Sequence, residues 1–228
     1  ESDLCLVQGV NILLSPEITI NHSRAGMLAP DGRCKAFDDS ADGFVRSEGC
    51  GAIVLKPLSK ARKDGDNVLA VIKGDCVNHD GHSSGLTVPS GPSQQEVIRS
   101  AIKNANLKPE DIHYIESHGT GTAMGDPIEI GALAAVFGTS HSKLQPLIVG
   151  SVKANIGHLE PAAGIAGIIK TVLMIQHRKI PGQVHFNEPS HLIDWQNIPI
   201  KIPQATMDFG KKAGSLIAGV SSFGFGGT

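Results

Sequence analysis

Short apolar runs rich in β-branched residues alternate along the chain with longer segments of helical periodicity. This alternation is typical of an α/β fold with a largely parallel or mixed sheet. The pattern predicts helices over about Ser93–Ala105, Asp126–Phe137 and Pro161–Lys179. It predicts strands over Leu4–Val10, Gly51–Leu55, Val68–Val77, His113–Glu116, Leu147–Val152, Ile198–Ile202 and Leu216–Val220.

Two of the predicted helices carry further local signals. The run DPIE, which starts at Asp126, offers an acidic N-cap, a proline at the first helical position and a glutamate at the third. This is the pattern of a capping box, so we expect Asp126 and Glu129 to cap the helix rather than to move protons. The run AAGIAGIIKTVLMIQ at 162–176 is apolar nearly all the way round, which predicts a buried helix. Gly164 and Gly167 would there allow the close approach of another backbone.

Composition and charge narrow the class of protein. The 228 residues are 40% hydrophobic and 18% charged, with a formal net charge of −2, as in a globular protein that can bury a sizeable core. Such a charge gives no reason to expect nucleic acid or an anionic membrane as a partner. No apolar run approaches the roughly 18 residues that cross a bilayer. The four cysteines show no CxxC pair, so a reducing, cytoplasmic location fits best.

Three segments could carry chemistry, because each follows a predicted strand, where α/β folds build their sites. His118 lies in ESHGTGT at 116–122, and His158 ends GSVKANIGH at 150–158. The helix that opens near residue 161 points its positive end at His158, and Lys153 would act in the same direction if it lay nearby. We therefore expect a neutral His158 ring. The third segment, GVSSFGFGGT at 219–228, could aim amide hydrogens at an oxyanion, although such turns are more often packing.

Other motifs are better explained as loops. GHSSG at 81–85 has the spacing of a hydrolase elbow but no helix after it. The glycines at 119, 121 and 125 lack the spacing and the downstream acid of a dinucleotide site. His79 and His82 have no further ligands at suitable spacing, so we expect no metal site.

Taken together, ESHGTGTAMGDPIE, GSVKANIGHLEPAAGIAGIIK and GVSSFGFGGT are similar, in order and spacing, to three signature blocks of the C-terminal part of β-ketoacyl synthases. The segments 21–61 and 78–95 also resemble this family, in the style of multifunctional polyketide synthases more than of stand-alone fatty-acid enzymes. The resemblance implies a thiolase-like layered α/β fold of two similar halves, each with a mixed five-stranded sheet, around buried helices. The polar run at 56–67 would then separate the tail of the first half, 1–60, from most of the second half, 61–228, which would lack its last strand.

The resemblance also implies a Cys-His-His mechanism. A thiolate takes an acyl group, which is then attacked by a carbanion made by decarboxylating a malonyl thioester. His118 and His158 match the two family histidines, and Lys153 matches a lysine that orients and tunes them. Thr120 and Thr122 match hydroxyls that contact the phosphopantetheine arm of the substrate.

Two phenylalanines and several partners follow from the same resemblance. The backbone N–H of Phe225 matches half of the oxyanion hole for the acyl thioester, and Phe223 and Phe225 would gate the acyl pocket. The substrates would arrive on acyl carrier protein, which carries the phosphopantetheine, and the chain itself would bind no cofactor. Family members are usually homodimers, so we expect a homodimer when the synthase is complete.

The nucleophile is the departure from the family pattern. Family members carry it in a Cys-Ser-Ser turn of the first half, and this motif does not occur here. None of the four cysteines starts a buried helix that would lower its pKa; they are Cys5, Cys34, Cys50 and Cys76. We therefore expect a piece that begins downstream of the nucleophile, needs the N-terminal half that carries it, and is inactive in condensation alone. Two alternatives stay open: a non-catalytic remnant or docking half of a synthase, and a thiolase-like acyltransferase.

Overall fold

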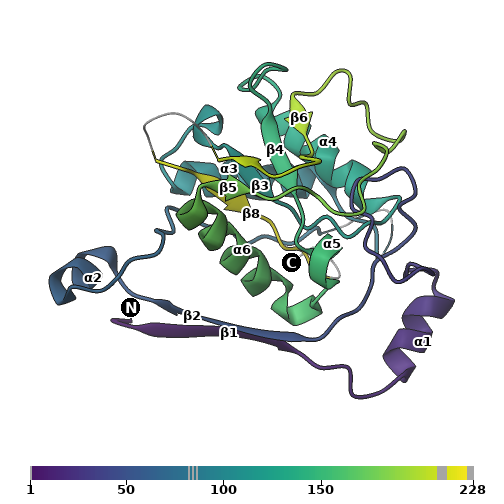
Figure 1. Cartoon of the computed structure of the whole chain (residues 1–228), viewed down its shortest axis with the longest axis horizontal. Helices are drawn as coiled ribbons and strands as arrows, with labels where there is room; N and C mark the ends of the chain where they lie inside the picture. The colour runs from purple at the N-terminus through teal and green to yellow at the C-terminus, as the bar shows by residue number, and fades with distance from the viewer. Residues whose placement is uncertain (1, 82, 84, 86, 210–214, 225–228) are drawn as a thin grey trace.

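The computed structural model describes residues 2–81, 83, 85, 87–209 and 215–224. Its helices are α1 Glu17–Arg24, α2 Leu58–Asp64, α3 Gly91–Asn104, α4 Gly125–Phe137, α5 Lys153–Ile156 and α6 Ala163–His177, with the 3-10 turns η1 Pro109–Asp111 and η2 Glu160–Ala162. Its strands are β1 Cys5–Asn11, β2 Gly49–Leu55, β3 Tyr114–Glu116, β4 Leu147–Gly150, β5 Lys179–Ile180, β6 Ile200–Lys201, β7 Met207–Asp208 and β8 Ala218–Val220. The elements stack as alternating layers of helix and sheet (Figure 1).

A parallel sheet forms the centre of the molecule. Its strands lie in the order β6-β4-β3-β8, and every pairing between neighbours is parallel. All residues of β3 and β4 are buried, as expected for parallel strands that are covered on both faces. The pairs β1-β2 and β5-β7 are antiparallel and lie outside this sheet.

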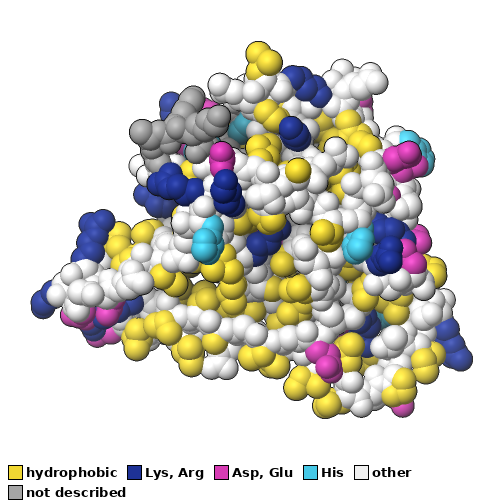
Figure 2. Space-filling model, viewed as in Figure 1, with side chains coloured by type: hydrophobic (Ala, Val, Ile, Leu, Met, Phe, Trp, Pro, Cys, Tyr) yellow, Lys and Arg dark blue, Asp and Glu magenta, His cyan; other side chains and the backbone are white. Residues whose placement is uncertain are grey.

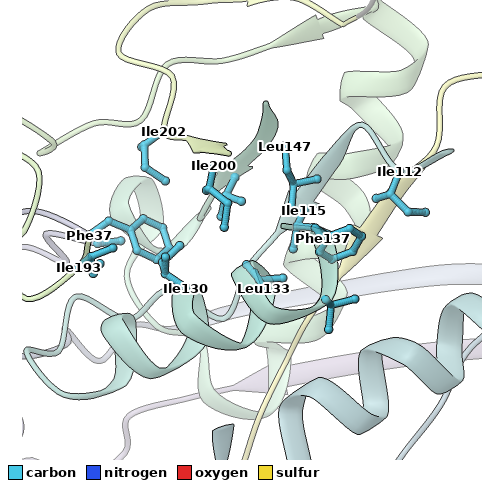
Figure 3. Close-up of a cluster of buried hydrophobic side chains, with 13 residues drawn as sticks. Phe37, Ile112, Ile115, Ile130, Leu133, Phe137, Leu147, Ile193, Ile200 and Ile202 are labelled. Carbon is cyan, nitrogen blue, oxygen red and sulfur yellow. The ribbon is translucent and has the colours of Figure 1, made fainter. Parts of the chain in front are cut away.

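Helix α4 covers one face of the sheet and α3 packs against α4. Ile130, Leu133 and Phe137 of α4 contact Ile115 of β3 and Leu147 of β4 in one buried cluster (Figure 3). Their spacing of three and four residues places these side chains on one side of the helix, which explains why this side faces the sheet. This cluster is the larger part of the core.

Helix α6 covers the opposite face and lies between the sheet and the β1-β2 ribbon (Figure 1). On the ribbon side, Ile165 belongs to a cluster that also contains Val7 and Ile53. Two ribbon glycines make the approach close: a Cβ added at Gly9 would lie 3.0 Å from the Cα of Ala162, and one added at Gly51 would lie 2.9 Å from Cγ2 of Ile165. The helix and the ribbon therefore touch with no ribbon side chain between them at these two points.

The outward face of the β1-β2 ribbon is apolar and exposed. Leu6, Val10 and Val54 are 59%, 53% and 64% exposed, and Figure 2 shows hydrophobic side chains along the lower edge of the molecule, where the ribbon runs. A two-stranded ribbon is marginal by itself in water, so packing on α6 is what holds this one. Both of its faces thus carry apolar side chains.

The predicted α/β class is confirmed, and most predicted elements form within a few residues of their expected bounds. The strand predicted over Val68–Val77 is wrong, because these residues form neither helix nor strand. Ile72 and Val77 are 60% and 77% exposed, so the apolar run has no sheet partner among the described residues. Among the described residues the central sheet has four parallel strands, whereas the resemblance implied a mixed sheet of five.

The expectations for the predicted buried helix, which forms α6, are partly wrong. Leu173 is 48% exposed, so one side of the helix faces outward. Gly164 and Gly167 do allow close neighbours, but these are side chains of Ser222, Glu116 and Val220 rather than another backbone. Within the described residues, no helix has the length and apolar character needed to cross a lipid bilayer.

Replacement of the most enclosed leucine tests the core. Leu133 is 0% exposed, so Leu133→Ala should lower the free energy of unfolding by about 2–5 kcal/mol through lost burial and a cavity. Urea denaturation measures this change. Leu144 is 95% exposed, and Leu144→Ala should change stability by less than about 0.5 kcal/mol. Equal effects of the two replacements would contradict the packing described here.

Candidate active site

The pairing of β3 with β4 places two loops side by side. Ile115 pairs with Val149 and Glu116 with Gly150, so both strands end at the same edge of the sheet. The loop after β3 carries His118, and the segment after β4 forms the short helix α5 and leads to His158. Residues that are far apart in sequence therefore meet at the carboxyl edge of the sheet, where α/β folds commonly place their sites.

The rings of His118 and His158 lie next to each other in an edge-to-face arrangement. Their centroids are 5.2 Å apart and their planes are inclined by 81°. The Nδ1 atom of His118 accepts the backbone N–H of Phe223 at 3.2 Å, and Nδ1 of His158 accepts the backbone N–H of Glu160 at 2.9 Å. A neutral imidazole that accepts at Nδ1 carries its proton on Nε2. Both rings are therefore held as Nε2–H donors.

Burial favours the neutral form of both rings, although both residues remain partly exposed. Burial is the largest cause that lowers the pKa of His118 well below its usual value, followed by the charge of Lys153 and by His158. Burial and then Lys153 lower the pKa of His158 to about 4, against a smaller opposing effect of Glu160. The direction agrees with the neutral His158 expected from the sequence. Its first cause is burial rather than the end of the following helix.

Lys153 is buried in α5, with a side chain that reaches into the same region. The residue is 3% exposed, and burial lowers its pKa while the carboxylates of Glu129 and Glu116 oppose this change. Its charge acts on both histidines in the direction that disfavours imidazolium. The structure thus brings His118, His158 and Lys153 together.

The predicted capping box is wrong. Helix α4 begins at Gly125, one residue earlier than expected, and neither predicted capping side chain caps it. Glu129 instead accepts the backbone N–H groups of His118 at 2.7 Å and Gly119 at 2.8 Å, and Asp126 accepts those of Phe37 at 2.7 Å and Gly121 at 3.2 Å. Both carboxyl groups hold the loop that carries His118, because buried N–H groups need acceptors.

Burial disfavours the ionised form of these two carboxyl groups. It raises the pKa of Asp126 to about 7, against the effect of the N–H donors. It also raises the pKa of Glu129, which Gly119, His118 and Lys153 oppose. The expected structural role of the two residues is thus consistent with their contacts, although those contacts lie outside their own helix.

The other expected site residues either lie around the histidines or fall outside the described residues. Phe223 contacts the His118 ring, with centroids 5.6 Å apart, and Phe225 lies outside the described residues. The hydroxyl of Thr122 accepts the N–H of Gly125 at 3.1 Å, so it caps the start of α4. Thr120 is 8% exposed and its hydroxyl lies 3.2 Å from that of Thr122.

A buried ionic network beneath the site was not predicted. Glu116 accepts the phenol of Tyr114 at 2.6 Å and lies 2.7 Å from the ammonium of Lys170. Its other oxygen accepts the backbone N–H of Val152 at 2.5 Å. The glutamate thus ties the end of β3 to the segment before Lys153. The only feature of the sequence that could have indicated a role for Glu116 was its position at the start of ESHGTGT.

A second pair that the sequence did not single out lies beside His158. Arg46 and Glu160 form an ion pair with Nε and Oε1 2.5 Å apart, and the Phe44 ring contacts the His158 ring with centroids 5.4 Å apart. No sequence pattern linked residue 46 to residue 160, because the contact depends on the tertiary fold.

None of the cysteines resembles an activated nucleophile. Cys34 is buried near Lys153, and burial raises the pKa of its thiol, which disfavours the thiolate. Cys5 and Cys50 lie on the exposed ribbon, and Cys76 is partly exposed. A cavity of about 300 Å³ borders Cys34, Lys153 and Gly157 but is not lined by the two histidines. Across the described part of the chain, no group of three or more His, Cys, Asp or Glu could hold a metal ion.

Comparison with family models gives two matches. The model described as "Beta-ketoacyl synthase, N-terminal domain" matches residues 1–61, and that described as "Beta-ketoacyl synthase, C-terminal domain" matches residues 69–187.

Similar proteins include large polyketide synthases. The chain is 49% identical over 225 residues to a phenolphthiocerol/phthiocerol polyketide synthase of Mycobacterium tuberculosis, covering 99% of the chain and 12% of that protein. It is 47% identical over 228 residues to erythronolide synthase EryA3 of Saccharopolyspora erythraea, covering all of the chain and 7% of that protein. Among solved structures, it resembles the ketosynthase from module 6 of the bacillaene synthase of Bacillus subtilis 168 at a TM-score of 0.94 and 41% identity, covering 99% of the chain and 41% of that chain. The expected thiolase-like α/β fold is confirmed.

Nitrogen NMR of the histidine rings tests the charge and tautomer of the site. At about pH 6, where a free imidazole is largely protonated, His158 should remain neutral with its proton on Nε2, because burial and Lys153 lower its pKa to about 4. The His158→Gln variant assigns the signal by its loss. An imidazolium signal at this pH, or a proton on Nδ1, would contradict the geometry.

The same shift makes stability depend on pH. The folded pKa of His158 lies below its ordinary value of 6.5, so the unfolded chain binds more protons between about pH 6.5 and 4. This histidine should therefore lower the free energy of unfolding as the pH falls through that window. Urea denaturation of the wild type should show a steeper pH dependence than that of His158→Gln.

Proposed function

Because the chain belongs to the β-ketoacyl synthase family, with similar proteins that are polyketide synthases, we propose that it forms part of a ketosynthase that joins an acyl thioester to a malonyl-type thioester by decarboxylative Claisen condensation. The observation that carries this proposal is the pair of neutral Nε2–H donors on His118 and His158, whose rings lie 5.2 Å apart. The chain spans 41% of the bacillaene ketosynthase chain, so the complete activity would need further residues.

In this reaction, the bond between the α-carbon and the carboxylate of the malonyl group breaks. Carbon dioxide leaves, and the electron pair forms an enolate whose negative charge lies largely on the thioester oxygen. Two neutral N–H donors aimed at this oxygen stabilise the enolate more than the ground state, which lowers the barrier. An imidazolium would lose its proton to the enolate, so burial and Lys153 support the reaction by keeping His118 and His158 neutral.

The enolate carbon would then attack the acyl thioester of a cysteine in the N-terminal half. The new carbon–carbon bond forms as the cysteine thiolate leaves, which frees the nucleophile for another acyl group. The cysteines of this chain do not serve, since burial raises the pKa of Cys34 and the chain contains no Cys-Ser-Ser motif. The exposed apolar face of the ribbon, with Leu6, Val10 and Val54, is where that half would pack.

The substrates would arrive on the phosphopantetheine arm of acyl carrier protein. Thr120 lies in the loop that carries His118 and could contact the arm, whereas the Thr122 hydroxyl already accepts an N–H of α4. Phe223 contacts the His118 ring and would border the acyl pocket together with Phe225. The complete synthase would be a homodimer.

A non-catalytic docking half is the second candidate, favoured by the lack of a Cys-Ser-Ser motif. Such a half would need the fold and the ribbon face but would have no use for two neutral histidines with matching tautomers. The histidines therefore separate the two candidates.

Replacement of either histidine in the assembled synthase tests the proposal. With the N-terminal half supplied, His118→Ala and His158→Ala should each slow decarboxylation of malonyl-acyl carrier protein by about 10²–10³-fold, the usual effect of removing one oxyanion donor. Release of labelled carbon dioxide measures the rate.

A matched control replaces a histidine away from the site. His177 is exposed in the last turn of α6, so His177→Ala should leave the rate unchanged. Unchanged decarboxylation in both His118→Ala and His158→Ala would favour the docking half.

The isolated chain tests the assignment of the nucleophile. Incubation with an acyl thioester should leave Cys34 unmodified, because it is 2% exposed and burial raises its pKa. Intact-mass spectrometry detects any adduct. The Cys34→Ala variant keeps the exposed Cys5, so an adduct that persists in this variant lies on a surface cysteine rather than on Cys34. A stoichiometric adduct on Cys34 would show that the chain has a nucleophile of its own.

A further inference from the structure

An ion pair lies directly behind His158. The Arg46 guanidinium donates to both carboxylate oxygens of Glu160, from Nε at 2.5 Å and from Nη2 at 3.0 Å. Its remaining nitrogen, Nη1, donates to the hydroxyl of Thr19 in α1 at 2.8 Å. The side chains of Arg46 and Glu160 are 7% and 24% exposed. Two parallel bonds in a partly dry environment make this kind of pair rigid as well as strong.

Glu160 has an unusual backbone. Its φ is +47°, in the left-handed region that residues with a side chain rarely adopt. In this conformation its N–H donates to Nδ1 of His158 at 2.9 Å. Strained backbone of this kind persists only where the surroundings over-determine it, and the two bonds from Arg46 fix the side chain of this residue.

The segment of Arg46 also holds the backbone of His158. The N–H of His158 donates to the carbonyl of Val45 at 2.7 Å, and the N–H of Ser47 donates to the carbonyl of His158 at 3.0 Å. These bonds form a parallel bridge between Arg46 and His158. One short segment therefore fixes the main chain of the histidine directly and its ring through Glu160.

The pairing also controls charge near the ring. His158 faces the ammonium of Lys153 from α5, the carboxylate of Glu160 from η2 and the ring of His118 after β3. A carboxylate by itself favours imidazolium, the opposite of what Lys153 does. The Arg46 guanidinium offsets this charge, so Glu160 stabilises the protonated ring less than an unpaired carboxylate would.

We propose that Arg46 and Glu160 are positioning residues, which hold the His158 ring with its proton on Nε2 by fixing the backbone N–H that occupies Nδ1. The catalytic consequence rests on the proposed decarboxylation, whereas the effect on the ring does not. Neither residue need contact the substrate.

Two replacements of Glu160 separate the ion pair from the backbone conformation. Glu160→Ala removes the pair and leaves a strained φ, so nitrogen NMR should show His158 as a mixture of tautomers. Glu160→Gly also removes the pair but tolerates positive φ, so it should keep more of the Nε2–H form. In the assembled synthase, Glu160→Ala should lower kcat of decarboxylation about tenfold to hundredfold, because a displaced donor is a poor one, with KM within about twofold.

Replacements of Arg46 test charge and geometry separately. Arg46→Lys keeps the charge but loses the forked geometry, so it should loosen the ring in the same way as Glu160→Ala. Arg46→Met leaves the Glu160 carboxylate unpaired next to the ring, so it should raise the pKa of His158. Glu160→Gln removes that negative charge, so it should not raise the pKa of His158. Lys56→Met removes two other ion pairs, with Asp64 and Asp66, in which the lysine side chain is 18% exposed, and should change neither the tautomer nor kcat.

The outcomes distinguish this inference from the proposed function. If His158→Ala abolishes decarboxylation but folded Glu160→Ala and Arg46→Lys keep the wild-type tautomer and kcat, the positioning role is wrong. If Glu160→Ala changes the tautomer but His158→Ala leaves decarboxylation intact, the positioning role stands and the proposed function fails. If Glu160→Ala does not fold, as judged by circular dichroism, Arg46→Lys decides the question.

Discussion

Parallel pairing of β3 with β4 is the constraint on which the site depends. Because the two strands end at the same edge, the loop of His118 and the segment of Lys153 start side by side. Two further bonds hold them together: Glu116 accepts the N–H of Val152, and the Ser151 hydroxyl donates to the carbonyl of Gly119 at 2.7 Å. Elements on both faces of the sheet bury Glu116 and Lys153 at this edge, while His118 and His158 remain partly exposed.

Partial burial makes the ionisation of each polar group of the site depend on its neighbours. In a medium of low polarity, a charge on one group changes the ionisation of its neighbours. Lys153 lowers the pKa of both histidines, while Glu129 and Glu116 support the charge on Lys153. Glu129 also holds the His118 loop, since it accepts the N–H of His118. Geometry and electrostatics at this site therefore depend on the same few side chains.

Much of the fold could be predicted because its signals are local. Periodicity located the main helices and most strands, and the strand–loop positions of His118 and His158 indicated the edge of the sheet. The strand expected over Val68–Val77 shows the limit: a β-branched run becomes a strand only when a partner strand lies beside it. The role of Asp126 could not be predicted either, because the competing acceptors and donors, such as the N–H of Phe37, are brought near only by the tertiary fold.

For the site, too, some features could be predicted from local sequence and others depended on the tertiary fold. The histidines could be named from their motifs, but the direction of each ring could not, since it depends on the backbone N–H groups of Phe223 and Glu160. Arg46 gave no signal at all, because an arginine in an irregular segment is usually solvated. Its importance depends on a parallel bridge to His158 that no local pattern reports.

Gly9 and Gly51 have a mechanical consequence. No ribbon side chain lies between Gly9 and the Cα of Ala162 or between Gly51 and the side chain of Ile165. A shift of α6 by one residue, about 1.5 Å along its axis, would therefore bring other atoms against the ribbon backbone. The base of the site is therefore stiff. Any change in the size of the site would therefore come from the loop that follows β3 rather than from α6.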